Sequence, residues 1–173
     1  MKSILNLGGG DARATLDALG RSLAIIEFKP DGTILTANAN FLNALGYELS
    51  EIRGQHHSLF VDPAERDSTA YRQFWAGLNR GEYSATEFKR IAKGGREIWI
   101  QASYNPILDN SGKVQKVVKF ATDITAQKLN AAHAEGQIAA IHSSQAVIEF
   151  ELDGTILTAN ENFLGAMDYN LDE

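Results

Sequence analysis

The hydrophobic positions of the chain fall in short runs, and the first two runs surround a turn. Residues 23–28 (LAIIEF) and 33–37 (TILTA) are rich in Ile and flank the segment KPDG at 29–32. In that segment Pro presets one backbone angle and Asp-Gly tolerates left-handed geometry, which suits a tight turn. The pattern predicts a β-hairpin.

The next segments have the spacing of helices. Asn38 is placed to cap a short helix that Gly46 ends, and a second short helix is expected up to Gly54. Beyond a connection, Asp67 or Ser68 is placed to cap a longer helix. That helix carries apolar residues at three- and four-residue spacing, namely Tyr71, Phe74, Trp75 and Leu78.

Three strand signals follow at 83–91, 96–107 and 114–124, separated by the turn-forming sequences KGG and DNSG. The segment 126–143 has no Pro and is rich in Ala, which predicts a linker helix with a weak apolar stripe. The expected order is two strands, helices, three strands and a linker helix.

The opening of this pattern returns at the end of the chain. Residues 24–51 and 146–173 align without a gap, and about two-thirds of the aligned positions are identical. Ile26 corresponds to Ile148 and Asn38 to Asn160, so the offset is 122 residues, the size of a domain. One fold is therefore encoded twice, and we expect the second copy to stop before its later strands.

Composition narrows the function classes. With 173 residues, a formal net charge of -6 and no Cys, the chain fits one soluble domain plus attachments. Scattered Lys and Arg predict no nucleic-acid partner, and no apolar run approaches the roughly 20 residues that span a bilayer. We expect a cytoplasmic fragment without membrane contact, and whether the parent protein is membrane-anchored stays open.

Several motifs in order resemble those of the PAS family: DGTILTANANFLNALGY, GQHHSLFVDP, FWAGLNRGEY, KGGREIWIQASYNPI and ATDIT. The resemblance covers about residues 20–127 and implies an α+β fold with a five-stranded antiparallel sheet, helices over one face and a pocket between them. We accordingly expect four parts: an N-terminal tail and cap helix (1–19), a PAS domain (20–125), a linker helix (126–144) and the truncated start of a second PAS domain (145–173).

The motifs are most similar to the tandem PAS modules of methyl-accepting chemotaxis and aerotaxis-type transducers. This resemblance implies a sensory input module that relays ligand or redox state to a downstream methyl-accepting signalling domain in the same parent chain. It also implies that Asp123, Ile124 and Thr125 pass the signal to the following helix. The alternatives are a PAS dimerisation or protein-interaction module without a ligand, and a Thr125 that is only an N-cap.

The candidate cofactor residues are His56, His57, Phe74, Trp75 and Trp99. A single His can hold haem iron, and His57 is favoured because it leads into an apolar segment. Trp75 and Trp99 are placed to flank a flavin, although a buried Trp is more often core packing. The sequence leaves haem b, flavin and no cofactor open, and it does not decide which sheet face Trp99 occupies.

No constellation of residues indicates an enzyme. The sequence has no HExxH, GxSxG or DxDxDG pattern, and its GGG at 8–10 lacks the Lys and Ser or Thr of a phosphate loop. We also expect a homodimer, in which the repeated strands 146–150 and 155–159 pair with a sheet edge of a neighbouring chain.

Overall fold

The computed structural model describes residues 9–170, and it divides into two compact units that meet between Thr125 and Ala126. Residues 1–8 of the expected tail and cap helix (1–19), and the last residues, 171–173, lie outside the described residues. Each unit is built around one copy of the repeated hairpin. Between residues 9 and 170, no helix is both long and apolar enough to cross a membrane.

The first unit is built on a five-stranded antiparallel sheet with the order β2-β1-β5-β4-β3. Its strands are β1 (Ala24–Phe28), β2 (Ile34–Ala37), β3 (Ser84–Ile91), β4 (Glu97–Leu108) and β5 (Val114–Asp123). The register places Phe28 opposite Val117 and Tyr104 opposite Lys119. Because cross-strand partners share a face, these four side chains all point inward.

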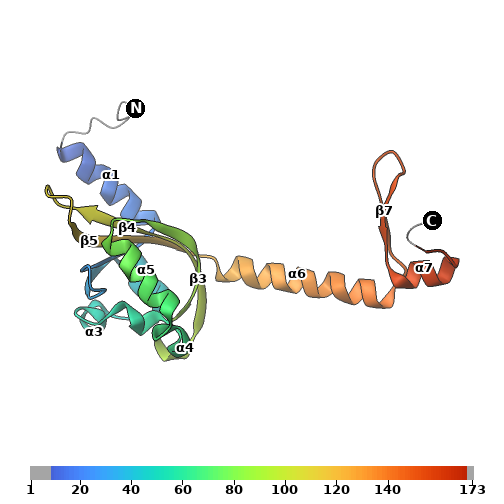
Figure 1. Cartoon of the computed structure of the whole chain (residues 1–173), viewed down its shortest axis with the longest axis horizontal. Coiled ribbons are helices and arrows are strands. Elements are labelled where there is room, and N and C mark those ends of the chain that lie inside the picture. The colour runs from blue at the N-terminus through green and yellow to red at the C-terminus, as the bar shows by residue number, and fades with distance from the viewer. Residues whose placement is uncertain (1–8, 171–173) are drawn as a thin grey trace. The chain divides into compact units, whose positions relative to one another are not determined.

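Helices between β2 and β3 cover one face of the sheet, as Figure 1 shows for α3, α4 and α5. They are α2 (Ala39–Leu45), α3 (Leu49–Ile52), the 3-10 helix η1 (His57–Phe60), α4 (Pro63–Arg66) and α5 (Thr69–Asn79). A helix α1 (Gly9–Ser22) precedes β1, and a 3-10 turn η2 (Lys93–Gly95) joins β3 to β4. The expected α+β fold class is confirmed.

Side chains at the predicted positions cap these helices. Asn38 accepts the Phe41 N–H at the start of α2, and Gly46 ends that helix at a φ of 74°. Of the two caps considered for α5, Ser68 is the one used. The sequence pattern missed η1 and α4, which lie in the segment expected to be a plain connection.

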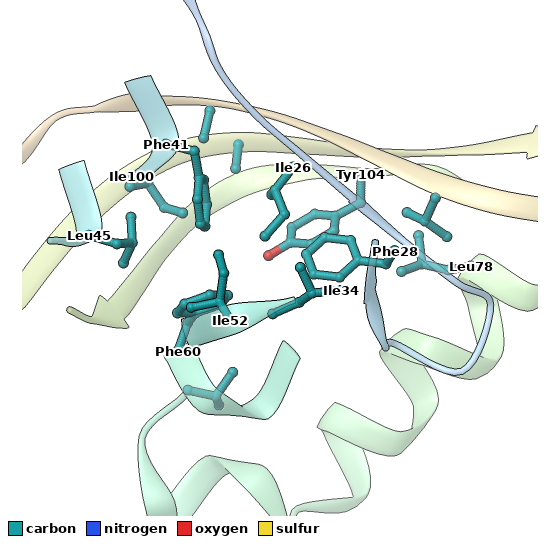
Figure 2. Close-up of a cluster of buried hydrophobic side chains, with 14 of the residues drawn as sticks. Ile26, Phe28, Ile34, Phe41, Leu45, Ile52, Phe60, Leu78, Ile100 and Tyr104 are labelled. Atoms are coloured by element: carbon teal, nitrogen blue, oxygen red, sulfur yellow. The ribbon is translucent and has the colours of Figure 1, made fainter. Parts of the chain in front are cut away.

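The core lies between the sheet and these helices. Figure 2 shows Phe28 and Tyr104 with their rings close together among aliphatic side chains such as Ile26 and Ile34. All four of these side chains are at most 1% exposed. The inward residues of β4 are Ile98, Ile100, Ala102 and Tyr104, so the period-two pattern of that strand sets the core face.

The second unit holds α6 (Thr125–Ser144) from its second residue on, β6 (Ile148–Phe150), β7 (Ile156–Ala159) and α7 (Glu161–Met167). Its hairpin has the same register and bulge as β1–β2. Its apolar side chains are exposed to solvent, however: Phe150 is 54% exposed, whereas its counterpart Phe28 is fully buried. Within the described residues, nothing in this unit takes the place that β3, β4 and β5 occupy in the first.

Candidate functional site

His57 is the polar centre of the first unit's core. It opens η1, is fully buried, and presents both ring nitrogens to tyrosine hydroxyls. Nδ1 lies 2.8 Å from the Tyr71 hydroxyl of α5, and Nε2 lies 3.0 Å from the Tyr104 hydroxyl of β4. The imidazole therefore links the helical layer to the sheet.

The electrostatic surroundings keep this imidazole neutral. Burial, and then the charges of Lys119 and Arg90, hold the pKa of His57 well below its usual value of 6.5. A neutral ring has one N–H and one acceptor nitrogen, so one tyrosine must donate to it and the other must accept from it. Burial raises the pKa of Tyr71 to about 12 and also raises the pKa of Tyr104, so both hydroxyls keep their protons at neutral pH.

Two cations are buried beside this network. The Lys119 Nζ lies 4.8 Å from the centre of the Tyr104 ring, and burial lowers the pKa of this lysine well below 10.5. The Arg90 guanidinium lies 4.6 Å from the centre of the Phe88 ring and 3.7 Å from the Glu65 carboxylate. Among the described residues, no carboxylate is buried with them, so the site has an excess of positive charge.

Two buried donors in this region have no acceptor. Trp75 Nε1 and Arg90 Nε are both inaccessible to solvent, and neither makes a hydrogen bond with the described residues. Tyr71 lies close enough to Trp75 for the indole to offset part of the burial effect on the Tyr71 pKa, but the pair does not reach hydrogen-bond geometry. Unpaired buried donors are uncommon in native proteins because each one loses its hydration.

His56 has a local structural role. Its exposed ring accepts the Ser58 N–H at Nδ1 and lies 3.0 Å from the Asp31 carbonyl at Nε2, so Nε2 carries the proton. A Cβ on Gly32 would lie only 2.5 Å from that nitrogen. His56 thus joins η1 to the β1–β2 turn.

The structure brings some of the sequence-predicted residues together and separates others. Trp75 and Phe74 both contact His57, with ring centres 5.5 and 6.4 Å away. Trp99 is half-buried on the opposite face of β4 from Ile98 and Ile100. The sheet therefore separates Trp99 from Trp75, and a flavin held between the two does not fit this arrangement.

The residues that sequence reasoning missed are Tyr71, Tyr104, Arg90 and Lys119. The sequence pattern places Tyr71 only on the apolar face of a helix. One available signal was Lys119, a charged residue within the apolar run VVKFA at a position whose neighbours two residues away point inward.

Haem ligation does not fit the site as it stands. A histidine that binds iron must turn one nitrogen to the metal, and both nitrogens of His57 are held by tyrosine hydroxyls. Apart from haem, residues 9–170 contain no group of three or more His, Cys, Asp or Glu residues that could hold a metal ion.

The expected relay residues lie where β5 leads into α6. The Asp123 carboxylate accepts the Thr125 N–H at 2.8 Å, and the Ile124 N–H donates to the Trp99 carbonyl at 2.8 Å. The Thr125 hydroxyl accepts the Trp99 N–H at 2.9 Å. An N-cap alone does not describe Thr125, because its hydroxyl binds the backbone of β4.

Known proteins resemble this chain in sequence. The PAS fold family matches residues 34–121. The biofilm dispersion protein BdlA of Pseudomonas aeruginosa is 46% identical over 90% of this chain and 37% of its own length. The aerotaxis receptor of Escherichia coli is 29% identical over 57% of this chain and 19% of its own.

Solved structures agree in fold. The crystal structure of a PAS domain from Colwellia psychrerythraea has a TM-score of 0.59 at 20% identity, over 66% of this chain and 98% of that one. A light-oxygen-voltage domain studied with a flavin analogue has a TM-score of 0.57 at 23% identity, over 76% of this chain and 99% of that one. Likeness at this level shows the fold alone, and the flavin belongs to that protein.

The chain belongs to the PAS fold family. It is a PAS sensory module of the kind found in chemotaxis-type transducers, as the resemblance implied. It spans little more than a third of the length of BdlA and about a fifth of the aerotaxis receptor.

Proposed function

We propose that this chain is the sensory input module of a chemotaxis-type transducer, which relays ligand or redox state to a methyl-accepting signalling domain in the same parent chain. In this proposal residues 20–125 are the sensing PAS domain, 126–144 the linker helix and 145–173 the start of a second PAS domain. The parent protein is cytoplasmic where this module lies, and the module carries out no catalytic step.

The observation that carries the proposal is a set of polar groups in the core whose hydrogen bonds or charges are not fully paired. Trp75 Nε1 and Arg90 Nε lack acceptors, and Lys119 is buried without a carboxylate partner. A core that served packing alone would be more stable with apolar residues there. These groups favour a small ligand that supplies acceptor atoms, such as a carboxylate.

The relay runs from this site along β4. Tyr104 contacts His57 at the inner face, and Trp99 on the same strand binds Thr125 through its backbone. A ligand that moves Tyr104 would shift β4 and hence the start of α6. Asp123, Ile124 and Thr125 are the relay residues in this proposal.

The first test asks what the core holds. Protein purified from its own host is denatured, and released small molecules are identified by mass spectrometry. We expect an acceptor-bearing molecule at near-equimolar amount, which is lost in Lys119→Met and kept in Lys116→Met, a change on the same strand. Protein that releases nothing would favour the alternative, a dimerisation module without a ligand.

Haem is tested separately by absorption spectroscopy after addition of haemin. Because tyrosines occupy both nitrogens of His57, we expect no Soret band from a ligated haem. A band that disappears in His57→Ala but persists in His56→Ala would reverse this conclusion and identify His57 as the iron ligand.

The proposal includes a homodimer formed through the second hairpin. The support is the exposed apolar surface of this hairpin and of α7 beside it in sequence, which includes Phe150, Ile156 and Met167, each more than half exposed. Removal of residues 142–173 should then convert a dimer to a monomer by light scattering. A shortened chain that is still dimeric would count against the hairpin as the dimer contact.

A further inference from the structure

Two asparagines of the first unit hold the end of the helix that precedes its hairpin. The Asn38 side-chain amide donates to the Gly20 and Leu23 carbonyls at 3.0 and 2.8 Å. The Asn40 amide donates to the same two carbonyls at 3.2 Å each and to the Arg21 carbonyl at 3.0 Å. These carbonyls lie at the end of α1, where a helix leaves its last acceptors unpaired.

The second unit repeats this arrangement at the 122-residue offset. The Asn160 amide donates to the His142 and Gln145 carbonyls at 2.8 and 2.6 Å. The Asn162 amide donates to the His142, Ser143 and Gln145 carbonyls at 3.3, 3.2 and 3.1 Å. We call each pair of asparagines, Asn38 with Asn40 and Asn160 with Asn162, an asparagine clamp.

The clamp recognises backbone, not side chains. Gly20, Arg21 and Leu23 have His142, Ser143 and Gln145 as counterparts, so the three residue types held are unlike in the two copies. The asparagines are the same, and the flanking strand segments 24–28 and 34–37 differ from 146–150 and 156–159 only by Ile25 against Val147. The clamp therefore accepts the carboxyl end of whichever helix leads into the hairpin.

Each clamp also reaches its own hairpin. Asn160 Oδ1 accepts the Val147 N–H at 2.9 Å just before β6, as Asn38 Oδ1 accepts the Ile25 N–H at 2.9 Å in β1. One side chain thus binds the helix end through its amide nitrogen and the hairpin through its amide oxygen. A movement of the helix end must change the hydrogen bonds of the hairpin.

In the second unit the clamped helix is α6, whose first residue, Thr125, is bonded to β4 through the Trp99 backbone. We propose that the clamp formed by Asn160 and Asn162 is the receiving end of the relay, so that α6 is both the outgoing helix of the PAS domain and the incoming helix of the second unit. A shift of β4 enters α6 at Thr125 and reaches the β6–β7 hairpin through the clamp. This inference extends the proposed relay and does not depend on which ligand is sensed.

The test is a double-mutant cycle on the whole chain, read by amide hydrogen exchange at sub-minute times. Thr125→Val removes the hydroxyl that binds β4 and keeps the side-chain shape. Asn162→Asp removes the amide donors, and Asn162 is chosen because Asn160 also caps α7. Asn40→Asp, the same change in the first clamp, is the matched control.

We expect Thr125→Val to speed exchange at residues 147–159 about threefold or more, and to have no further effect in the Asn162→Asp background. In the Asn40→Asp background its effect should persist. If the clamp has only a structural role, Thr125→Val and Asn162→Asp act independently, and their fold-changes in the exchange rate multiply in the double variant. The proposal is overturned if the hairpin does not respond to Thr125→Val, if it responds equally with the clamp broken, or if its amides are unprotected from the start.

If the protein proves to bind no ligand but shows this coupling, the clamp inference stands and the ligand-sensing part of the proposed function is wrong. If the protein binds a ligand but shows no coupling, the ligand-sensing part stands and the clamp inference is wrong. The two failures are therefore distinguishable.

Discussion

At the scale of single residues, the burial of Lys119 has a clear electrostatic cost. An ammonium group loses its hydration in the core, and the Tyr104 ring restores only part of that loss. In protein freed of any bound ligand, we expect Lys119→Met to raise the free energy of unfolding by about 1–3 kcal/mol in urea titrations. Lys116→Met, an outward change on the same strand, should alter it by less than about 1 kcal/mol.

The pH dependence of stability follows from the same group. The pKa of Lys119 is lowered in the folded state, so between that value and 10.5 the unfolded state binds more protons. Stability should therefore rise as the pH increases towards 10.5, and Lys119→Met should remove this part of the rise. If the Lys119→Met variant is less stable than the parent at pH 7, with both proteins freed of ligand, the ammonium has a stabilising partner within the protein.

His57 produces a second pH effect, in the acid range. The pKa of His57 in the folded state lies well below 6.5. Just below pH 6.5 this residue therefore binds a proton in the unfolded state but not in the folded state. Stability should fall there by at most about 1.4 kcal/mol per pH unit from this residue. His57→Gln, which can still bond both tyrosines, should reduce the loss of stability between pH 7 and pH 5.

At the scale of elements, the β1–β2 turn depends on the absence of a side chain at Gly32. Its φ is 86°, and an added Cβ would meet His56 Nε2 at 2.5 Å and the Trp75 ring at 3.1 Å. Gly112 has a similar φ of 83° but open space around it. Gly112→Ala should therefore cost about 1 kcal/mol from backbone strain alone, and Gly32→Ala clearly more, in the same unfolding assay.

A double variant separates the two contributions at this turn. Gly32→Ala with His56→Ala removes the closest clash, so its loss of stability should be smaller than the sum of the two single losses. A strictly additive result would mean that the ring moves aside at no cost and that η1 does not support the turn.

The elements were predictable where local signals dominate. The hairpin, the caps Asn38 and Ser68 and the three later strands follow from turn residues and periodicity. The short helices η1 and α4 have too few residues for a periodic pattern. Both faces of β4 carry large side chains, so alternation alone did not decide that Trp99 faces away from the core.

The site was only half predictable for a related reason. His57, Phe74 and Trp75 stand in segments with clear patterns, but the partners of His57 come from distant elements. Tyr104 reaches it because β4 pairs with β5 and β1 in a particular register. Register depends on long-range pairing, which a single sequence does not display.

At the scale of the whole molecule, the two units differ in how much of their apolar surface is covered. Counterparts of the same repeat are buried in the first unit and open in the second: Ile34 is 1% exposed and Ile156 58%, and Leu45 is 2% exposed and Met167 54%. A two-stranded hairpin with one short helix is marginal in water. The first unit should therefore carry nearly all of the cooperative stability.

This leads to a prediction about a chain that ends at Thr125, the last residue of the first unit. Such a chain keeps the five strands, the helical layer and the Thr125 hydroxyl that binds Trp99. At concentrations too low for the proposed dimer to form, we expect the free energy of unfolding of the shortened chain to lie within about 0.5 kcal/mol of that of the full chain, because a hairpin with one short helix adds little stability of its own. Under these conditions, amides of β4 and β5 in the full chain should exchange far more slowly than those of β6 and β7. At higher concentrations the proposed dimer should slow exchange in β6 and β7. Protection of that hairpin that does not change with protein concentration would contradict the dimer as its source.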